Sequence, residues 1–521
     1  MPLAIYTSAA WTANGGIEPA AGATVEVRSE ATGSLASLSE DRDGEVGKDN
    51  PFTADAQGRF AFFVAGGAYR VKVTDGENEH TLRWQAVGTA GERDIGTKSG
   101  EVPTNADILL TEDMTLRIPS DYATLQEAID ETSRFRVRQG VAIELLIESG
   151  HQPESGLAVY NGDFGHFIIR SESNDTVFLP SSHTGHFVYA RYATAPTLDC
   201  VVDMDAISVN NSREIEDPDE SDQGRNGYFI DRGSRGLVTS GSGILNCPGR
   251  RAIGAFRGSS IEAEGAICTN GAWAGIIAAR GSTISAQGAT ATGFAGRNVY
   301  SARSSTLNFH EGNADDGVSM GIVARRGSSI NASLATARNC GEAGVFEQLG
   351  AIVVAIEIDV SGSETGFNAQ QGGEITAPGA TANNCSRRVL EASRNVRINI
   401  RALSADNCGG DLSGDFSGVI EGLEGSHVNI EEAQITNCQH TAVWMARNCS
   451  CNANGSSVEG ADGIGYFAAQ LSSINCRNAN ASGTTDEGME VSNGSFIAAN
   501  GASGTISQTA NSITSDGIIF Q

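Results

Sequence analysis

The chain has 521 residues and a formal net charge of −28, from 63 aspartate and glutamate residues against 35 lysine and arginine residues. An acidic excess of this size repels a polyphosphate backbone, which argues against nucleic acid as a partner. No apolar run approaches the ~18 residues that cross a bilayer, and the first five residues (Met1-Pro2-Leu3-Ala4-Ile5) show no secretory signal. We therefore expect synthesis in the cytoplasm, no membrane insertion, and release by lysis or a dedicated machine.

The first predicted domain is residues 1–88, an antiparallel β-sandwich module of six or seven strands. Its runs 23–28, 59–64 and 69–74 alternate apolar and polar side chains. Turn residues separate these runs. Residues 89–115 then lose the periodicity and are predicted to be a linker. The chain as a whole has 64 glycines but only 11 prolines, which favours a turn-rich β protein over disorder.

Residues 116–235 are predicted to hold a capping helix and irregular first coils. Thr124 and Glu127 form a capping box, in which the threonine hydroxyl accepts the glutamate N–H and the carboxylate reaches back. Apolar side chains follow on one helix face, at Leu125, Ala128 and Ile129. Short strands are expected after the helix, at 142–147, 166–170 and 176–179.

Residues 236–521 carry an internal repeat, the strongest signal in the sequence. Twelve apolar reference positions recur at a sequence interval of 23, with one interval of 22 and one of 30: Val238, Ile261, Ile284, Leu307, Ile330, Val353, Ile375, Ile398, Val428, Cys451, Ile474 and Ile497. A second apolar column runs with them: Ile253, Ile276, Val299, Ile322, Val345, Phe367, Val443, Tyr466 and Met489.

Each repeat therefore holds at least two short strands joined by glycine-dependent turns. The unit is too short for a tetratricopeptide repeat or a propeller blade, and it lacks a leucine-rich consensus. With these architectures excluded, the repeat predicts a right-handed parallel β-helix with one coil per repeat. The predicted fold class is all-β: the N-terminal β-sandwich module, the capping helix, and a regular β-helix of about 23 residues per coil over 236–521.

A recurring Asn-Cys pair supports stacked coils. The pairs fall at the same place in four repeats, at 339–340, 384–385, 407–408 and 437–438. We expect the asparagines to form a ladder, with side-chain amides bonded between coils and a left-handed backbone.

The ten cysteines are predicted to be small core side chains, since none forms a CxxC pair or a zinc-finger spacing. Their number suits a reducing compartment, although stacked neighbours such as Cys385 and Cys408 could oxidise later.

Acidic residues cluster in two settings. The segment 214–222 packs six carboxylates into nine residues but lacks the pattern of a calcium loop, so a solvated excursion is expected. The turn after the Asn-Cys column carries further acids: Glu342, Glu364, Asp411, Asp462 and Asp486. Asp315 and Asp316 are the sharpest pair for glycosidase chemistry, which needs two carboxylates about 5–10 Å apart. We nevertheless favour the interpretation that Asp315 and Asp316 are solvated turn residues without a catalytic role.

The sequence identifies no catalytic residue, cofactor site or metal site. The histidines His310, His427 and His440 are scattered, and no nucleophile–histidine arrangement, phosphate-binding loop or HExxH motif is present. Aromatic residues on the repeats are sparse for a sugar-stacking cleft.

Three stretches carry a resemblance to a known family. The first, which runs from Ala23-Thr-Val-Glu-Val27 through Thr53-Ala-Asp-Ala-Gln-Gly-Arg-Phe60 to Gly67-Ala-Tyr-Arg-Val71, resembles the N-terminal module of tail fibres and tailspikes of tailed bacteriophages. The second, 118–129, is similar to the capping helix of their pectate-lyase-like β-helices. The third stretch, the closing residues 516–520, resembles the ends of such chains.

The resemblance implies a virion protein that attaches to the host. It implies a homotrimer that docks to the phage tail through the N-terminal module and recognises a bacterial surface polysaccharide. Many tailspikes add a C-terminal trimerisation domain, whereas this sequence stops after its last coil, so trimer contacts are expected from the rod itself. A polysaccharide depolymerase, hydrolase or lyase, is the alternative, and a bacterial surface adhesin is a third.

Overall fold

The computed structural model describes residues 4–9, 20–30, 32–65, 67–76, 78–87, 109–133, 135–180, 183–204, 226–412, 417–503, 512–513 and 516–520. The chain divides into two compact units, Met1–Asp107 and Ile108–Gln521. Within the described ranges, no helix has the length and apolar character needed to span a bilayer. The acidic segment 214–222 and most of the predicted linker lie outside these ranges.

The N-terminal unit is an antiparallel β-sandwich, as predicted. Eight described strands form two four-stranded sheets, where six or seven strands had been expected. One sheet contains β1 (Ala4–Ala9), β6 (Arg59–Val64), β3 (Leu38–Ser39) and β4 (Gly47–Lys48). The other contains β5 (Phe52–Thr53), β2 (Thr24–Ser29), β7 (Gly67–Asp75) and β8 (Asn78–Val87). Alternate side chains such as Val25, Val27, Phe62 and Val71 are fully buried between the sheets. The additional strands have two residues each, too short to show alternation.

Near its start the second unit contains a capped helix, α1 (Leu125–Thr132), as predicted. The Thr124 hydroxyl accepts the Glu127 N–H at 3.1 Å, and the Glu127 carboxylate accepts the Ala123 N–H at 3.1 Å. The first coils contain two small parallel sheets: β9 (Leu109–Leu110) with β11 (Arg136–Val137), and β10 (Met114–Ile118), β12 (Ile143–Ile147), β14 (Phe167–Ser171) and β17 (Thr197–Asp199). Thus Leu109 and Leu110, within the predicted linker, already pair with β11.

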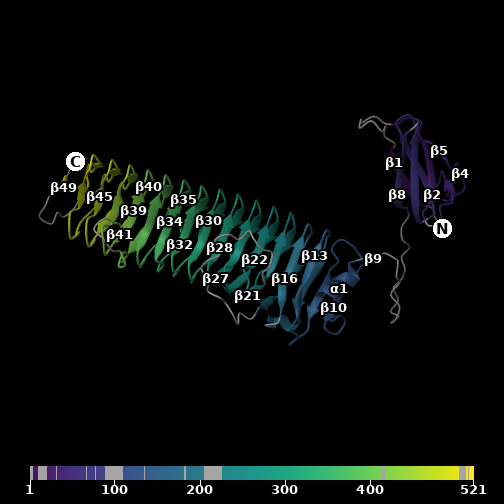
Figure 1. The fold of residues 1–521 in the computed structure, drawn as a ribbon, viewed down its shortest axis with the longest axis horizontal. Coiled ribbons are helices and arrows are strands. Elements are labelled where there is room, and N and C mark those ends of the chain that lie inside the picture. The colour runs from purple at the N-terminus through teal and green to yellow at the C-terminus, as the bar shows by residue number, and fades with distance from the viewer. Residues whose placement is uncertain are drawn as a thin grey trace. The chain divides into compact units, whose positions relative to one another are not determined.

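The rest of the unit is a parallel β-helix whose longest sheet has 15 strands, stacked side by side in Figure 1. These are β13 (Ser155–Tyr160), β16 (Thr184–Arg191), β19 (Tyr228–Asp231), β22 (Arg251–Phe256), β25 (Ala274–Ala279), β28 (Arg297–Ala302), β30 (Met320–Arg325), β32 (Ala343–Gln348), β34 (Thr365–Gln370), β36 (Arg388–Ser393), β39 (Ile420–Leu423), β42 (Val443–Met445), β45 (Tyr466–Ala468), β47 (Met489–Val491) and β49 (Ser512–Ile513).

A second sheet of 13 strands runs beside it: β20 (Arg235–Leu237), β23 (Ser260–Glu262), β26 (Thr283–Ser285), β29 (Thr306–Asn308), β31 (Ser329–Asn331), β33 (Ile352–Val354), β35 (Glu374–Thr376), β37 (Arg397–Asn399), β40 (His427–Asn429), β43 (Ser450–Asn452), β46 (Ser473–Asn475), β48 (Phe496–Ala498) and β50 (Ile518–Phe520). Shorter sheets complete the coils: β15 (Val177–Phe178), β18 (Val201–Asp203), β21 (Gly243–Cys247), β24 (Ile267–Gly271) and β27 (Thr290–Phe294), then β38 (Ser404–Asp406), β41 (Gln434–Thr436) and β44 (Ser457–Glu459).

Eleven of the twelve predicted reference positions stack in register along the 13-stranded sheet, from Ile261 to Ile497. The twelfth, Val238, is wrong by two residues, because Gly236 pairs with Ile261. A Cβ on Gly236 would meet the Tyr228 hydroxyl at 2.6 Å, so the tyrosine takes the space of the missing apolar side chain. The second apolar column is confirmed in the 15-stranded sheet, where Leu390 and Ile420 fill its gap.

The Asn-Cys asparagines adopt the predicted left-handed backbone, with φ of 56° at Asn339, 54° at Asn384, 55° at Asn407 and 50° at Asn437. The ladder itself is mixed. Asn407 donates to Asn384 at 2.9 Å, whereas Asn339 donates to Asp316 at 3.1 Å. Aspartate can therefore replace asparagine as the acceptor in this column.

All ten cysteines are buried and none forms a disulfide bond, in keeping with their predicted place in the core. Burial raises the pKa of Cys247 to about 11, so its thiol stays protonated near neutral pH. No group of three metal-ligating side chains occurs among the described residues.

A buried serine column closes the corner between the two long sheets. The N–H of Ser234, Ser259 and Ser282 each donates to the serine hydroxyl of the next coil, at 3.1–3.2 Å. The column is interrupted where Ala351 is followed one coil later by Gly373. There the Glu347 carboxylate, which is fully buried, accepts the Ala351 N–H at 2.9 Å. An internal glutamate thus replaces a serine hydroxyl.

Candidate functional site

The predicted acid pair does not form a site. Asp315 is buried and both its carboxylate oxygens bind Arg338, one through the backbone N–H at 2.8 Å and the other through the guanidinium at 2.6 Å. Asp316 is exposed, has a left-handed backbone and accepts from Asn339. Asp315 therefore stabilises the coil, and Asp316 belongs to the polar ladder.

The other predicted candidates are dispersed. Most of the turn acids stack on neighbouring coils just before strands of the 15-stranded sheet; Glu364 is 3.6 Å from Arg387 and Asp462 accepts from Thr485 at 3.2 Å. His427 bonds Ser450 at 2.6 Å, and His310 lies 3.8 Å from Glu311. Neither contact gives a catalytic arrangement.

A different carboxylate pair lies on the outer face of the 15-stranded sheet. Glu391 on β36 and Glu421 on β39 follow directly after the apolar residues Leu390 and Ile420, and they pair in register on adjacent coils. Arg388 binds both: its guanidinium is 2.6 Å from Glu421 and 3.3 Å from Glu391. One cation thus holds two carboxylates on neighbouring strands.

The two carboxylates have different surroundings. The Glu421 side chain is 7% exposed and that of Glu391 is 24% exposed. Burial raises the pKa of Glu421 above its ordinary value, the Glu391 charge raises it further, and Arg388 opposes the shift. The result is a buried acid with a raised pKa beside a more exposed carboxylate, an arrangement that can separate acid from base roles.

An apolar pair continues the same outward column. Glu421 pairs in register with Trp444, and Trp444 with Phe467. The two rings lie 5.5 Å apart and are largely buried. Because both rings are buried, they form an apolar surface beside Glu421 and are not exposed for stacking against a sugar.

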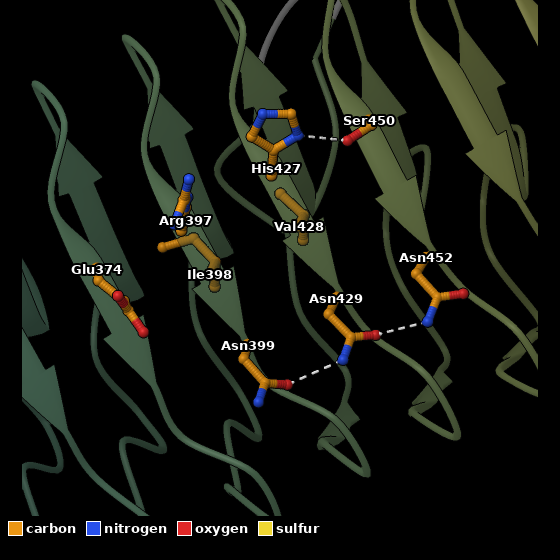
Figure 2. A pocket seen from close by; sticks show the side chains of 9 residues that line it. All are labelled: Glu374, Arg397, Ile398, Asn399, His427, Val428, Asn429, Ser450 and Asn452. Atoms are coloured by element: carbon orange, nitrogen blue, oxygen red, sulfur yellow. Dashed lines mark hydrogen bonds between the residues drawn. The ribbon is translucent and has the colours of Figure 1, made fainter.

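A shallow groove of about 290 Å³ lies on the outer face of the 13-stranded sheet (Figure 2). The amides of Asn399, Asn429 and Asn452 form a row, bonded to one another at 3.0 Å. His427 points toward Ser450 at one side of this row, and Arg397 lies on the adjacent strand. The groove offers polar contacts but holds no acid pair.

Glu391 and Glu421 were not among the residues predicted from the sequence, although a signal for them existed. Both follow a member of the second apolar column, but Leu390 and Ile420 were not assigned to that column. The insertion at 409–415 lengthens the sequence interval between the two glutamates, which hides their stacking. Extending the column through both coils would have placed the two acids side by side.

Comparison with known proteins gives only remote structural neighbours. No protein-family model and no curated protein matches the sequence. A family 28 exopolygalacturonase of Yersinia enterocolitica is 10% identical, with a TM-score of 0.40, covering 91% of this chain and 98% of that one. The periplasmic alginate epimerase AlgG is 10% identical, with a TM-score of 0.31, over 78% and 85% of the chains. A GH87 α-1,3-glucanase catalytic domain is 9% identical, with a TM-score of 0.31, over 100% and 88%. No functional residue is carried over from them.

Proposed function

We propose that the protein binds a polysaccharide along the outer face of its 15-stranded sheet and hydrolyses it at Glu391 and Glu421. The observation that carries this proposal is the register pairing of two carboxylates in unlike surroundings. Adjacent strands lie about 4.8 Å apart, close to the ~5–5.5 Å separation of the two carboxyl groups in retaining glycosidases.

The surroundings assign a role to each acid. Glu421, whose pKa is raised by burial, acts as the acid: it gives a proton to the glycosidic oxygen as the bond to the leaving sugar breaks. Glu391, the accessible carboxylate, attacks the anomeric carbon and forms a glycosyl ester. Glu421 then takes a proton from the water that hydrolyses this ester, which restores both groups. Arg388 positions the two carboxylates.

The resemblance of the N-terminal module and the capping helix supports a finer proposal. In it, the polysaccharide is a bacterial surface glycan, and the protein is a phage tail fibre or tailspike, a homotrimer attached to the virion tail. These assignments rest on the quoted sequence stretches alone.

Replacing Glu421 or Glu391 with glutamine is expected to lower the release of reducing ends from a bacterial surface polysaccharide by about 10²-fold or more. Glutamine keeps the size and one hydrogen bond to Arg388 while removing the transferable proton or the nucleophile. Asp316→Asn is the matched control and should retain the native rate, because Asp316 only accepts a ladder bond.

Full activity in Glu421→Gln, or loss of activity in Asp316→Asn, would place the chemistry elsewhere. Binding of the polysaccharide without any release of reducing ends by the native protein would refute hydrolysis and leave an adhesive function.

A further inference from the structure

From β13 to β39, each coil contains a residue with a left-handed backbone directly after its strand in the 15-stranded sheet. In five successive coils this residue is an arginine, with φ of 51–58°: Arg232, Arg257, Arg280, Arg303 and Arg326. The N–H of each donates to the last residue of the next strand in the sheet, at 3.0–3.2 Å, so the five form one straight column. We call this set the arginine column.

Arginine is a costly choice for this backbone. A left-handed conformation costs a side-chain-bearing residue about 1–2 kcal/mol, and glycine, asparagine and aspartate adopt it most readily. The same five coils have a second left-handed column, which contains only such residues: Asn246, Asn270, Gly293, Asp316 and Asn339. Later coils have Leu349 and Gln371 at the position of the arginine column, so the turn does not require arginine. In the first two coils of the column the guanidinium also binds the buried Asp231, at 3.5 Å from Arg232 and 2.6 Å from Arg257.

The arginine column begins beside exposed aromatic rings. Tyr192 occupies the column position one coil before Arg232 and is 54% exposed. Its hydroxyl accepts from Arg232 at 3.2 Å, and the guanidinium groups of Arg191 and Arg232 lie 5.6 and 5.8 Å from its ring. Tyr160, 52% exposed, pairs in register with Arg191. Exposed rings of this kind stack on the apolar faces of sugars.

The column also leads toward the acid pair. Three coils beyond Arg326 the same left-handed position is Arg394, with φ of 64°. Arg394 comes three residues after Glu391 and directly after the end of the same strand, β36. The column position therefore passes three strand residues from Glu391, with Leu349 and Gln371 in the two coils between Arg326 and Arg394.

We propose that the arginine column binds an acidic polysaccharide, with its carboxylated sugars aligned along successive coils. The coil repeat of about 4.8 Å is comparable with the length of one sugar in an extended chain, so guanidinium groups and carboxylates can meet in step. Guanidinium is the side chain best suited to bind carboxylate through two parallel hydrogen bonds. This inference narrows the substrate class and so rests on the proposed function.

The test measures binding separately from cleavage, in the full-length Glu421→Gln protein. One variant adds Arg280→Gln, Arg303→Gln and Arg326→Gln. The matched control adds Arg397→Gln, Arg401→Gln and Arg477→Gln, which removes the same charge from the other sheet and its turns. Labelled alginate oligosaccharides carry a carboxylate on every sugar, dextran oligosaccharides carry none, and single-stranded DNA supplies a polyphosphate.

We expect the column variant to lose about tenfold or more in alginate affinity relative to the control variant, with equal melting temperatures. Alginate binding should weaken as salt rises, and dextran should bind far more weakly. Equal alginate affinity of the two variants would overturn the proposal, as would tighter binding of DNA than of alginate. If alginate binding depends on the arginine column but the native protein releases no reducing ends, the proposed hydrolysis is refuted and the binding proposal stands.

Discussion

The substitution Gly373→Ser is expected to lower the stability of the protein by about 3 kcal/mol or more. The same substitution is expected to restore stability when it is combined with Glu347→Ala. A Cβ on Gly373 would overlap the Glu347 carboxyl group, so glycine is needed wherever that carboxyl is present. Alanine occupies the position of Glu347 in both adjacent coils, at Ala324 and Ala369. The double variant therefore recreates an ordinary coil, in which the serine hydroxyl accepts the Ala351 N–H.

At pH 5, where the Glu347 carboxyl is protonated in the folded chain, the single variant Glu347→Ala leaves that N–H without its acceptor and should lose about 1–3 kcal/mol. Denaturant unfolding of the native chain, both single variants and the double variant measures the coupling between the two sites. A double variant as unstable as the sum of the single variants would show that Glu347 does not replace the serine.

The stability of the protein is also expected to fall as pH rises from about 5 to 8 because of Glu347. Burial raises the pKa of this carboxyl to about 8, and the N–H groups of Ala351 and Gln370 only partly offset the shift. Below the ordinary glutamate pKa, both folded and unfolded chains hold the proton. Between that value and 8 only the unfolded chain ionises, so unfolding becomes steadily more favourable; above 8 the loss levels off.

The loss over this window is on the order of 4 kcal/mol, at 1.36 kcal/mol per pH unit. Glu347→Gln removes the titration and should be the more stable protein at pH 8, with a stability difference that shrinks toward pH 5. Since other carboxyls titrate in both proteins, the difference between them isolates Glu347. A difference that stays constant across the window would contradict a protonated internal glutamate.

The repeat predicted the β-helix because a parallel coil fixes the spacing of inward side chains. Once the interval is recognised, each reference side chain from Ile261 to Ile497 is expected to stack on the equivalent side chains of the two adjacent coils. The prediction was wrong at Val238 because the ring of Tyr228, on the preceding strand, fills the core there and leaves Gly236 at the column position.

The functional residues were harder to predict for a physical reason. Glu391 and Glu421 are outward residues whose pairing depends on placing Leu390 and Ile420 in the second apolar column, and the insertion at 409–415 hides that register. Glu347 is an ionisable residue at an inward position, where the pattern predicts an apolar side chain. The core accommodates its carboxyl group only because Gly373, on the next coil, has no side chain at that place. Side chains that depend on such tertiary pairs leave no local periodic signal.

The most direct test of the account is a crystal structure of the Glu421→Gln protein with an acidic oligosaccharide. Sugar density is expected along the outer face of the 15-stranded sheet, with carboxylates on the arginine column and a glycosidic oxygen at residue 421. Sugar bound instead in the groove around Asn429, or no sugar at either place at saturating concentration, would contradict it.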